Sequence, residues 1–185
     1  MNPEASPAAA AAAAARAAIA AAAAAELRAQ HLTFWLGDSV FALGIDSVRE
    51  IIQYGQMTHV PLTPAFVRGV INLRGAVVPV IDLQARLGHA RAAVGEKTCI
   101  VIFDAQRDGE RLELGLMVDA VSEVIEIAPD QVEPAPQFGS AVPREFIRGL
   151  AKVKDRFVVL LETDSALDIE AMATLCDLEQ ERLAA

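Results

Sequence analysis

Residues 69–87 read GVINLRGAVVPVIDLQARL, and the same pattern returns at residues 149–167 as GLAKVKDRFVVLLETDSAL. The two copies align without a gap, so that Arg74 lies opposite Lys154 and the apolar pairs that follow coincide. Self-similarity at a fixed spacing is typical of a structural unit that occurs twice. The sequence therefore predicts that this chain of 185 residues is built from two related halves.

The repeat also extends upstream of this stretch. The segment LGIDSVREII, which contains Glu50, parallels LGLMVDAVSEVI, which contains Glu123. Further upstream, TFWLGDSVFALG from Thr33 parallels a segment that begins at Thr98 and has a longer turn. Each half thus has the same predicted order of elements, namely a hairpin, a third strand, a proline-containing connection and a second hairpin.

Each half contains five short segments rich in β-branched and aromatic residues, a composition typical of strands. They are HLTFWL, VFALGI, VREIIQY, VRGVINL and VVPVIDL in the first half, and TCIVIFD, LELGLMV, SEVIEI, IRGLAKV and FVVLLE in the second. Because an open sheet of such short strands would leave its edges exposed, closure into a barrel is favoured. We predict an all-β fold of two packed five-stranded barrels with short helices. The first barrel is expected over about residues 30–88 and the second over about residues 97–163.

The two ends of the chain lie outside the predicted barrels. Residues 1–28 form an Ala-rich extension that is either flexible or helical, since Ala is the strongest helix former. This extension lacks a basic start and carries Arg16, so we predict neither a signal peptide nor direct insertion into a membrane. At the other end, the apolar spacing within residues 165–183 predicts a terminal helix, and the folded domain is expected to span residues 29–180.

The net negative charge of the chain favours protein partners. The net charge of -9 and the pI near 4.8 disfavour nucleic acid and anionic membrane surfaces, which attract clustered Lys and Arg. The cysteines Cys99 and Cys176 match no metal or redox spacing, so we expect both to be small buried apolar residues in a reducing compartment.

Side chains that would support catalysis are not grouped in this sequence. His31, His59 and His89 are isolated from one another and from cysteine, so no metal site is expected. The glycines near the repeated hairpin flank a strand and do not open a helix, which excludes the usual phosphate-binding loop. No order of Ser, His and Asp suggests a nucleophile. We therefore predict neither an enzyme nor a bound cofactor.

Several long motifs resemble one known family. The run VREIIQYGQMTHVPLTPAFVRGVINLRGAVVPVIDL resembles the core of CheW-like domains, and VDAVSEVIEI, VEPAPQF and FIRGLAKVKDRFVVLLE resemble their later part. The resemblance covers roughly residues 30–180. It implies two SH3-like barrels that meet along a shared apolar core. It also implies a cytoplasmic scaffold, recruited to membrane-associated arrays, that binds the cytoplasmic tip of methyl-accepting chemoreceptors and the regulatory domain of the chemotaxis histidine kinase.

The same resemblance implies a partner-binding surface in the first half. Its central members would be a charged pair, Glu50 and Arg74. The surrounding members would be Val48, Ile51, Val70, Asn72, Leu73 and Gly75. Two other interpretations stay open from the residues alone: an exposed ion pair is worth only about 0–1 kcal/mol, and strand alternation would turn about half of the apolar members toward a core. Gly75 also suits a tight turn.

We therefore predict an adaptor that couples chemoreceptors to the chemotaxis histidine kinase within signalling arrays. One alternative is an adaptor of a non-flagellar chemosensory pathway that controls twitching motility or gene expression. A more distant alternative is a barrel that binds a small molecule.

Overall fold

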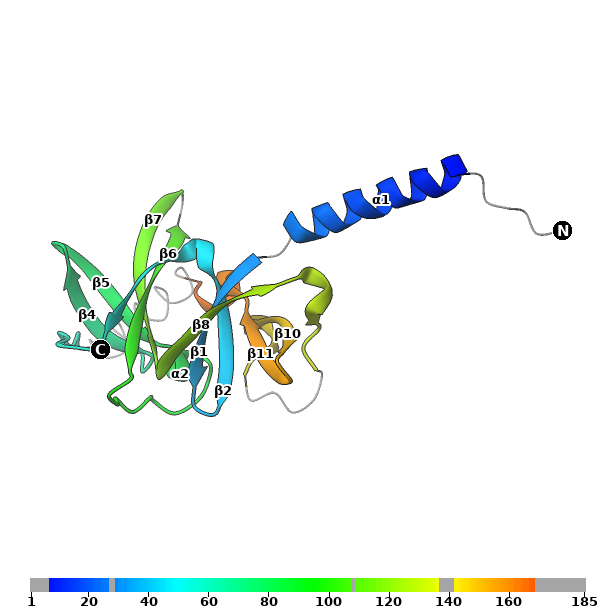
Figure 1. Cartoon of the computed structure of the whole chain (residues 1–185). Coiled ribbons are helices and arrows are strands. Elements are labelled where there is room, and N and C mark those ends of the chain that lie inside the picture. Colours follow the sequence, from blue (N-terminus) through cyan, green and yellow to red (C-terminus); the bar gives the residue numbers. More distant parts are fainter. Residues whose placement is uncertain (1–6, 27–28, 108, 137–141, 169–185) are drawn as a thin grey trace.

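Strands are the main elements of the chain in a computed structural model, which describes residues 7–26, 29–107, 109–136 and 142–168 (Figure 1). The strands are β1 (Ala29–Leu36), β2 (Ser39–Gly44), β3 (Val48–Gln53), β4 (Val67–Leu73), β5 (Ala76–Asp82), β6 (Cys99–Arg107), β7 (Glu110–Val118), β8 (Ala120–Ile127), β9 (Val132–Glu133), β10 (Ile147–Val153) and β11 (Arg156–Leu161). The helices are α1 (Pro7–Glu26), α2 (Leu83–Arg86) and α3 (Thr163–Ala166), with single 3-10 turns η1 (Ile45–Ser47), η2 (Pro129–Gln131) and η3 (Arg144–Phe146). All ten predicted segments form strands, which confirms the all-β class.

The strands form two sheets, and each sheet curls into a barrel. The first, barrel A, has the order β8-β1-β2-β11-β10-β9, and the second, barrel B, has the order β3-β6-β7-β5-β4. The parallel contacts are equivalent in the two barrels, because β11 lies beside β2 in barrel A as β5 lies beside β7 in barrel B. Barrel B has the five strands predicted, whereas barrel A has a sixth, the two-residue strand β9. Apart from β9, the two barrels are two copies of one strand arrangement, as the internal repeat predicts.

The predicted division of the chain between the barrels is wrong. Barrel A takes its first hairpin, β1 and β2, from the first half and its other strands from the second half. Barrel B takes β3, β4 and β5 from the first half and the hairpin of β6 and β7 from the second. Neither the range 30–88 nor the range 97–163 thus corresponds to one barrel, because the two halves exchange their hairpins.

The exchange follows from the length of two connections. Strands β2 and β8 both run antiparallel to β1, so they run in the same direction on either side of it. If the third strand of the same half occupied the position of β8, it would run in the same direction as the hairpin strand before it. The chain would then need a crossover connection of about a dozen residues to reach that position. Only Ile45–Ser47 separates β2 from β3, and only Asp119 separates β7 from β8. The chain therefore continues forward out of one barrel and into the other.

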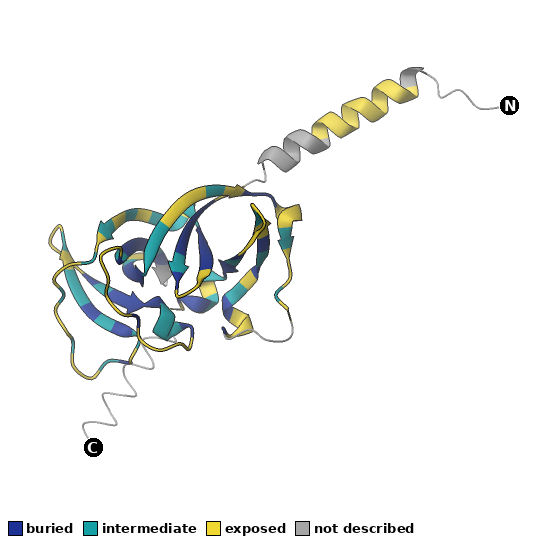
Figure 2. Cartoon of the chain, turned by 60° about the horizontal axis from the view of Figure 1, so that its bottom comes forward, coloured by how far each residue is buried: buried dark blue, intermediate teal, exposed yellow. Residues whose placement is uncertain are grey.

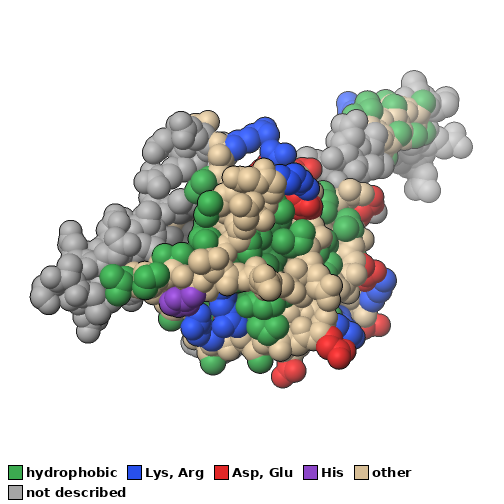
Figure 3. Space-filling view, turned by 90° about the vertical axis from the view of Figure 1, so that its left-hand side faces the viewer, with side chains coloured by type: hydrophobic (Ala, Val, Ile, Leu, Met, Phe, Trp, Pro, Cys, Tyr) green, Lys and Arg blue, Asp and Glu red, His purple; other side chains and the backbone are tan. Residues whose placement is uncertain are grey.

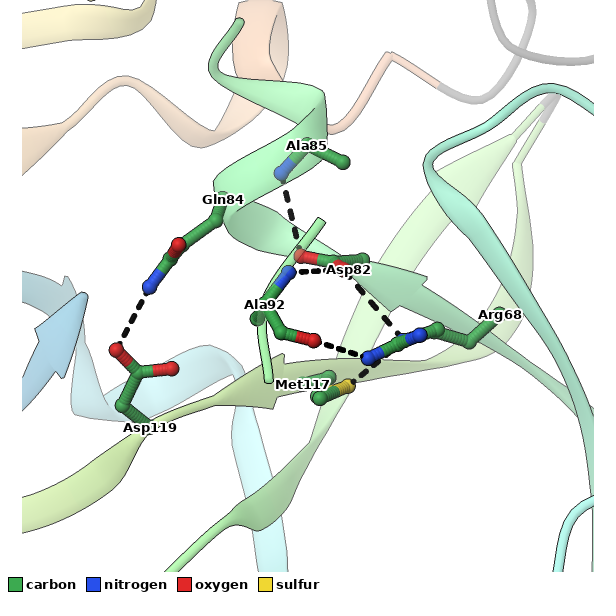
Figure 4. A network of polar contacts seen from close by, with 7 residues as sticks. All are labelled: Arg68, Asp82, Gln84, Ala85, Ala92, Met117 and Asp119. Carbon is green, nitrogen blue, oxygen red and sulfur yellow. Dashed lines mark hydrogen bonds and ion pairs between the residues drawn. The ribbon is translucent and has the colours of Figure 1, made fainter. Parts of the chain in front are cut away.

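Asp119 also fixes the point where the chain crosses from barrel B to barrel A. Its Oδ2 atom accepts hydrogen bonds from the backbone N–H of Gly37, at 2.7 Å, and from Nε2 of Gln84, at 2.6 Å. Figure 4 shows the contact with Gln84. Gly37 belongs to the turn between β1 and β2, whereas Gln84 lies on α2 after β5. One carboxylate therefore ties elements of both barrels to the crossing point.

The apolar core has three parts. One cluster fills barrel A, a second fills barrel B, and the largest lies between them. This shared cluster combines fully buried residues of barrel A, such as Phe34 and Leu43, with Val101 and Leu116 of barrel B. Figure 2 shows buried residues along the strands of both barrels. Since each such side chain stabilises the fold by about 1.5–3 kcal/mol, the shared core predicted from the family resemblance holds the barrels together.

An arginine sits between equivalent phenylalanines of the two halves. The Arg86 guanidinium lies 5.3 Å from the centre of the Phe66 ring and 4.6 Å from that of Phe146. Its Nε donates a hydrogen bond to the Ala166 carbonyl at 2.9 Å. Burial lowers the pKa of Arg86, although it remains a cation, because an arginine stays charged throughout the ordinary pH range. This cation joins α2 to α3 where the two copies meet.

The ends of the chain follow the predictions in part. Residues 7–26 form α1, which projects from the barrels, and its side chains at positions 9–19 are exposed (Figure 1). Among the described residues no helix is both long and apolar enough to span a membrane. At the other end, α3 forms a single turn, and the rest of the predicted terminal helix, from residue 169, lies outside the described residues.

Candidate partner-binding surface

The predicted charged pair forms on barrel B. Glu50 lies on β3 and Arg74 directly follows β4, in the turn before β5, and β3 and β4 are the opposite edges of the barrel B sheet. Curling of the sheet brings them together, so that one terminal nitrogen of Arg74 lies 2.8 and 2.9 Å from the two Glu50 carboxylate oxygens. The ion pair therefore closes the barrel at its rim, and 74% of the Arg74 side chain remains exposed to solvent.

The turn that carries Arg74 has an unusual backbone. Arg74 has a φ of 51° and Gly75 a φ of 86°, so both residues adopt the left-handed conformation. This suits a two-residue hairpin turn, but for a residue with a side chain it costs about 1–2 kcal/mol. Oδ1 of Asn72 accepts a hydrogen bond from the Gly75 N–H at 2.9 Å and stabilises the turn. Asn72 and Gly75 therefore hold Arg74 in place.

The predicted apolar members divide between the surface and the core. Ile51 faces outward with 42% of its surface exposed. By contrast, Val48 packs against the shared core and Leu73 against the barrel B core. Val70 is half-buried and exchanges backbone hydrogen bonds with Thr58. Of the four, Ile51 is the most exposed, while Val48, Val70 and Leu73 are partly exposed.

Two outward-facing residues of this surface were missed from the sequence. Val77 is 69% exposed and lies opposite Asn72 in the β4–β5 ladder. Arg49 lies on β3 two residues before Ile51, and its Nε is 2.7 Å from Oδ2 of Asp104. The hydrogen bond to Asp104 raises the pKa of Arg49. Strand alternation could have indicated both residues, because each occupies an outward position next to a predicted member.

The Glu50–Arg74 surface, defined as Arg49, Glu50, Ile51, Arg74 and Val77, thus combines exposed apolar and charged side chains. Figure 3 views the molecule from the side on which β4 and β5 lie in Figure 1. Hydrophobic side chains gather near the middle of that side, with charged groups around them. An apolar centre with a polar rim is the usual composition of a protein-binding surface.

A buried polar network lies in barrel B, at the end of the β4–β5 hairpin opposite the Arg74 turn (Figure 4). Arg68 of β4 lies 3.5 Å from the fully buried carboxylate of Asp82, at the end of β5. Asp82 also accepts hydrogen bonds from the backbone N–H of Ala85, at 3.2 Å, and of Ala92, at 2.9 Å. Arg68 donates in turn to the Ala92 carbonyl and to the sulfur of Met117. The network fixes β4, the start of α2 and the segment around Ala92 relative to one another.

Comparison with known proteins identifies the family. A family model described as the CheW-like domain matches residues 30–171. The chain belongs to the CheW-like family. The resemblance seen in the sequence motifs is thereby confirmed.

Individual relatives align with most of this CheW-like chain. It is 34% identical over 144 residues to the chemotaxis protein CheW of Klebsiella aerogenes, with 78% of this chain and 84% of that protein covered. It is 38% identical over 134 residues to the probable chemotaxis protein CheW of Rhizobium etli, with 72% and 84% covered. The crystal structure of the scaffolding protein TtCheW from Thermoanaerobacter tengcongensis matches with a TM-score of 0.65 at 33% identity, covering 73% of this chain and 84% of that one. This CheW-like chain is accordingly a chemotaxis scaffold protein.

The CheW-like chain repeats its charged pair on barrel A. Nζ of Lys154 lies 3.4 Å from Oε1 of Glu123, and both side chains are largely exposed. Lys154 has a φ of 50°, nearly the value of Arg74, so the two turns also match. The looser pair on barrel A supplies a natural control for experiments on barrel B.

Proposed function

We propose that this CheW-like chain couples chemoreceptors to the chemotaxis histidine kinase, and that the Glu50–Arg74 surface contacts one of these two partners. The proposed contacts are the cytoplasmic tip of a methyl-accepting receptor and the regulatory domain of the kinase. The observation that carries the proposal is the ion pair of Glu50 with the exposed Arg74, which is held in a left-handed turn. The exposed Ile51 follows Glu50 on β3, and the exposed Val77 lies on β5 shortly after the turn.

The geometry of the turn supports this role. A flexible surface arginine loses side-chain and backbone freedom when a partner orders it, and that loss weakens binding. Arg74 is already restrained by its turn and by Glu50. Its guanidinium has further donors for a carboxylate or a carbonyl of the partner. A left-handed arginine is costly for the isolated chain, so its presence at the rim is better explained by contact with a partner than by stability.

Two barrels joined by a rigid core also suit a scaffold. Each barrel carries its own exposed charged pair, so the chain has two separate surfaces for binding partner proteins. In a cytoplasmic protein recruited to membrane-associated arrays, several weak contacts of this kind would act together through high effective concentration. The shared core keeps the two surfaces at a fixed spacing.

We expect Arg74→Glu to weaken binding to at least one partner about tenfold or more, because it places like charges at Glu50 and removes a cation from the interface. Its effect on folding should stay within about 1 kcal/mol, since the side chain is largely exposed. Binding would be measured by titration calorimetry against a purified receptor signalling fragment and, separately, against the kinase regulatory domain.

The matched control is Lys154→Glu, which makes the same change at the equivalent turn of barrel A. The proposal requires the two variants to differ in which partner they affect, or in how strongly. Unchanged affinity of Arg74→Glu for both partners would refute the role of this surface. Failure of the unmodified chain to bind either partner would refute the coupling function itself.

A further inference from the structure

The mouth of barrel A contains a pocket of about 230 Å³. It opens between β8 and the hairpin of β10 and β11. Thr33 and Val153 lie in its wall, together with other valines and Ile125. Glu123, Lys154 and Arg156 also line it, and the two cations come from the β10–β11 hairpin. The pocket therefore joins an apolar interior to a charged opening.

The pocket exists because barrel A has smaller interior side chains than its copy. The hairpin registers and the parallel contacts place Thr33 of barrel A where barrel B has Ile102. The 80-residue repeat places Val153 where barrel B has Leu73. Ile102 is fully buried and Leu73 packs against the core of barrel B. The same architecture is thus filled by larger side chains in one barrel and left partly open in the other.

The opening of the pocket favours an anion. Lys154 is engaged by Glu123, at 3.4 Å. The Arg156 guanidinium lies 5.0 Å from the centre of the Trp35 ring, and within the described residues it makes no ion pair. The rim therefore carries two cations and one carboxylate. This local excess of positive charge contrasts with the net charge of -9 of the whole chain.

We infer that this pocket binds a small carboxylate with an apolar tail. The tail would occupy the space among Val40, Val153 and Val158, and the carboxylate would face Arg156 and Lys154. The volume lies below the range of about 300–1,000 Å³ typical of pockets for drug-sized ligands. The ligand is therefore limited to roughly six to ten heavy atoms. Its site is on barrel A, apart from the Glu50–Arg74 surface.

Ligand binding can be followed by the fluorescence of Trp35, because it is the only tryptophan of the chain and Arg156 stacks on its ring. Titration of the full chain with hexanoate is expected to change tryptophan fluorescence in a saturable way. For a ligand of this size the Kd should be about 0.1–10 mM. Hexan-1-ol and hexylamine, which have the same tail, should bind at least about tenfold more weakly, since the alcohol has no negative charge to pair with Arg156 and Lys154 and the protonated amine is repelled by them.

Two variants test the charged opening and the apolar interior of the pocket. Arg156→Gln should weaken hexanoate binding about tenfold. Val153→Leu, which introduces the side chain found at the equivalent position of barrel B, should weaken it at least about fivefold by occupying the pocket. Arg111→Gln on β7, which removes an exposed arginine away from the pocket, should bind as the unmodified chain does. Because Arg156→Gln alters the surroundings of Trp35, its affinity would be measured by calorimetry.

Three results would overturn the inference. They are the absence of saturable binding at 50 mM hexanoate, equal binding of hexanoate and hexylamine, and unchanged affinity in both pocket variants. Since the titration contains no receptor or kinase, its outcome is independent of the coupling function proposed above.

Discussion

Replacement of Asp82 by alanine is expected to destabilise the chain by about 3–5 kcal/mol, the usual cost of removing one partner from a buried ion pair. The carboxylate is fully buried, and it accepts the backbone N–H groups of Ala85 and Ala92. Without it, both donors lose their partner and the largely buried Arg68 cation loses its counter-charge. Each of these changes leaves a polar group buried without compensation, which is more costly than the loss of an exposed contact.

Urea unfolding at equilibrium measures this prediction, and the repeat supplies its control. Glu162 is the equivalent of Asp82 in the second half, at the start of α3, but its side chain is only half-buried and does not cap that helix. Glu162→Ala should therefore cost about 1 kcal/mol or less. If the two variants lost similar stability, the buried network would not be the source of the Asp82 effect.

The positions of the strands could be predicted from the sequence because they depend on local composition. Alternation of β-branched and polar residues marks a strand regardless of its neighbours. The equivalence of the turns at Arg74 and Lys154 also follows from the repeat, and both residues have the same left-handed backbone in the structure. The contact between Glu50 and Arg74 came from the family resemblance, and the structure confirms it with distances of 2.8 and 2.9 Å.

The pairing of the strands could not be predicted in this way. Because the halves are alike, the composition of the strands does not show whether a hairpin joins the third strand of its own half or that of the other half. The choice depends on the single residue Asp119 and on the short turn Ile45–Ser47, neither of which has a distinctive composition. The similarity of the two halves also led to one wrong alignment between their sequences. The structure shows that Thr33 is equivalent to Ile102 and not to Thr98. The longer β6–β7 hairpin is the reason for that misalignment.

The buried network was missed for a related reason. Asp82 matches Glu162 in the repeat, and duplication accounts for this match without indicating what either carboxylate contacts. Its actual partners are Arg68, 14 positions earlier in the sequence, and Ala92, 10 positions later. No periodicity links these positions, so only the folded chain shows that the carboxylate joins them.

The second large effect is expected at Gly69, where alanine should destabilise the fold by about 2–4 kcal/mol. The φ of Gly69 is 152°, in a region that residues with side chains rarely adopt. A Cβ atom there would collide with the Thr58 carbonyl oxygen and lie 2.9 Å from the Met57 side chain. The carbonyl cannot yield easily, because Thr58 exchanges two backbone hydrogen bonds with Val70, at 3.0 and 2.9 Å.

The displaced segment would also disturb the proposed partner surface, since Val70 belongs to the strand that leads to Arg74. Gly69→Ala should therefore lower the unfolding free energy and also increase amide exchange at Thr58 and Val70. Gly109→Ala is the matched control, because Gly109 has a φ of 80° but no atom lies within 4 Å of its added Cβ. That variant should lose only about 1 kcal/mol through backbone strain. Equal losses would mean that strain alone, and not the close approach of Thr58, requires glycine at position 69.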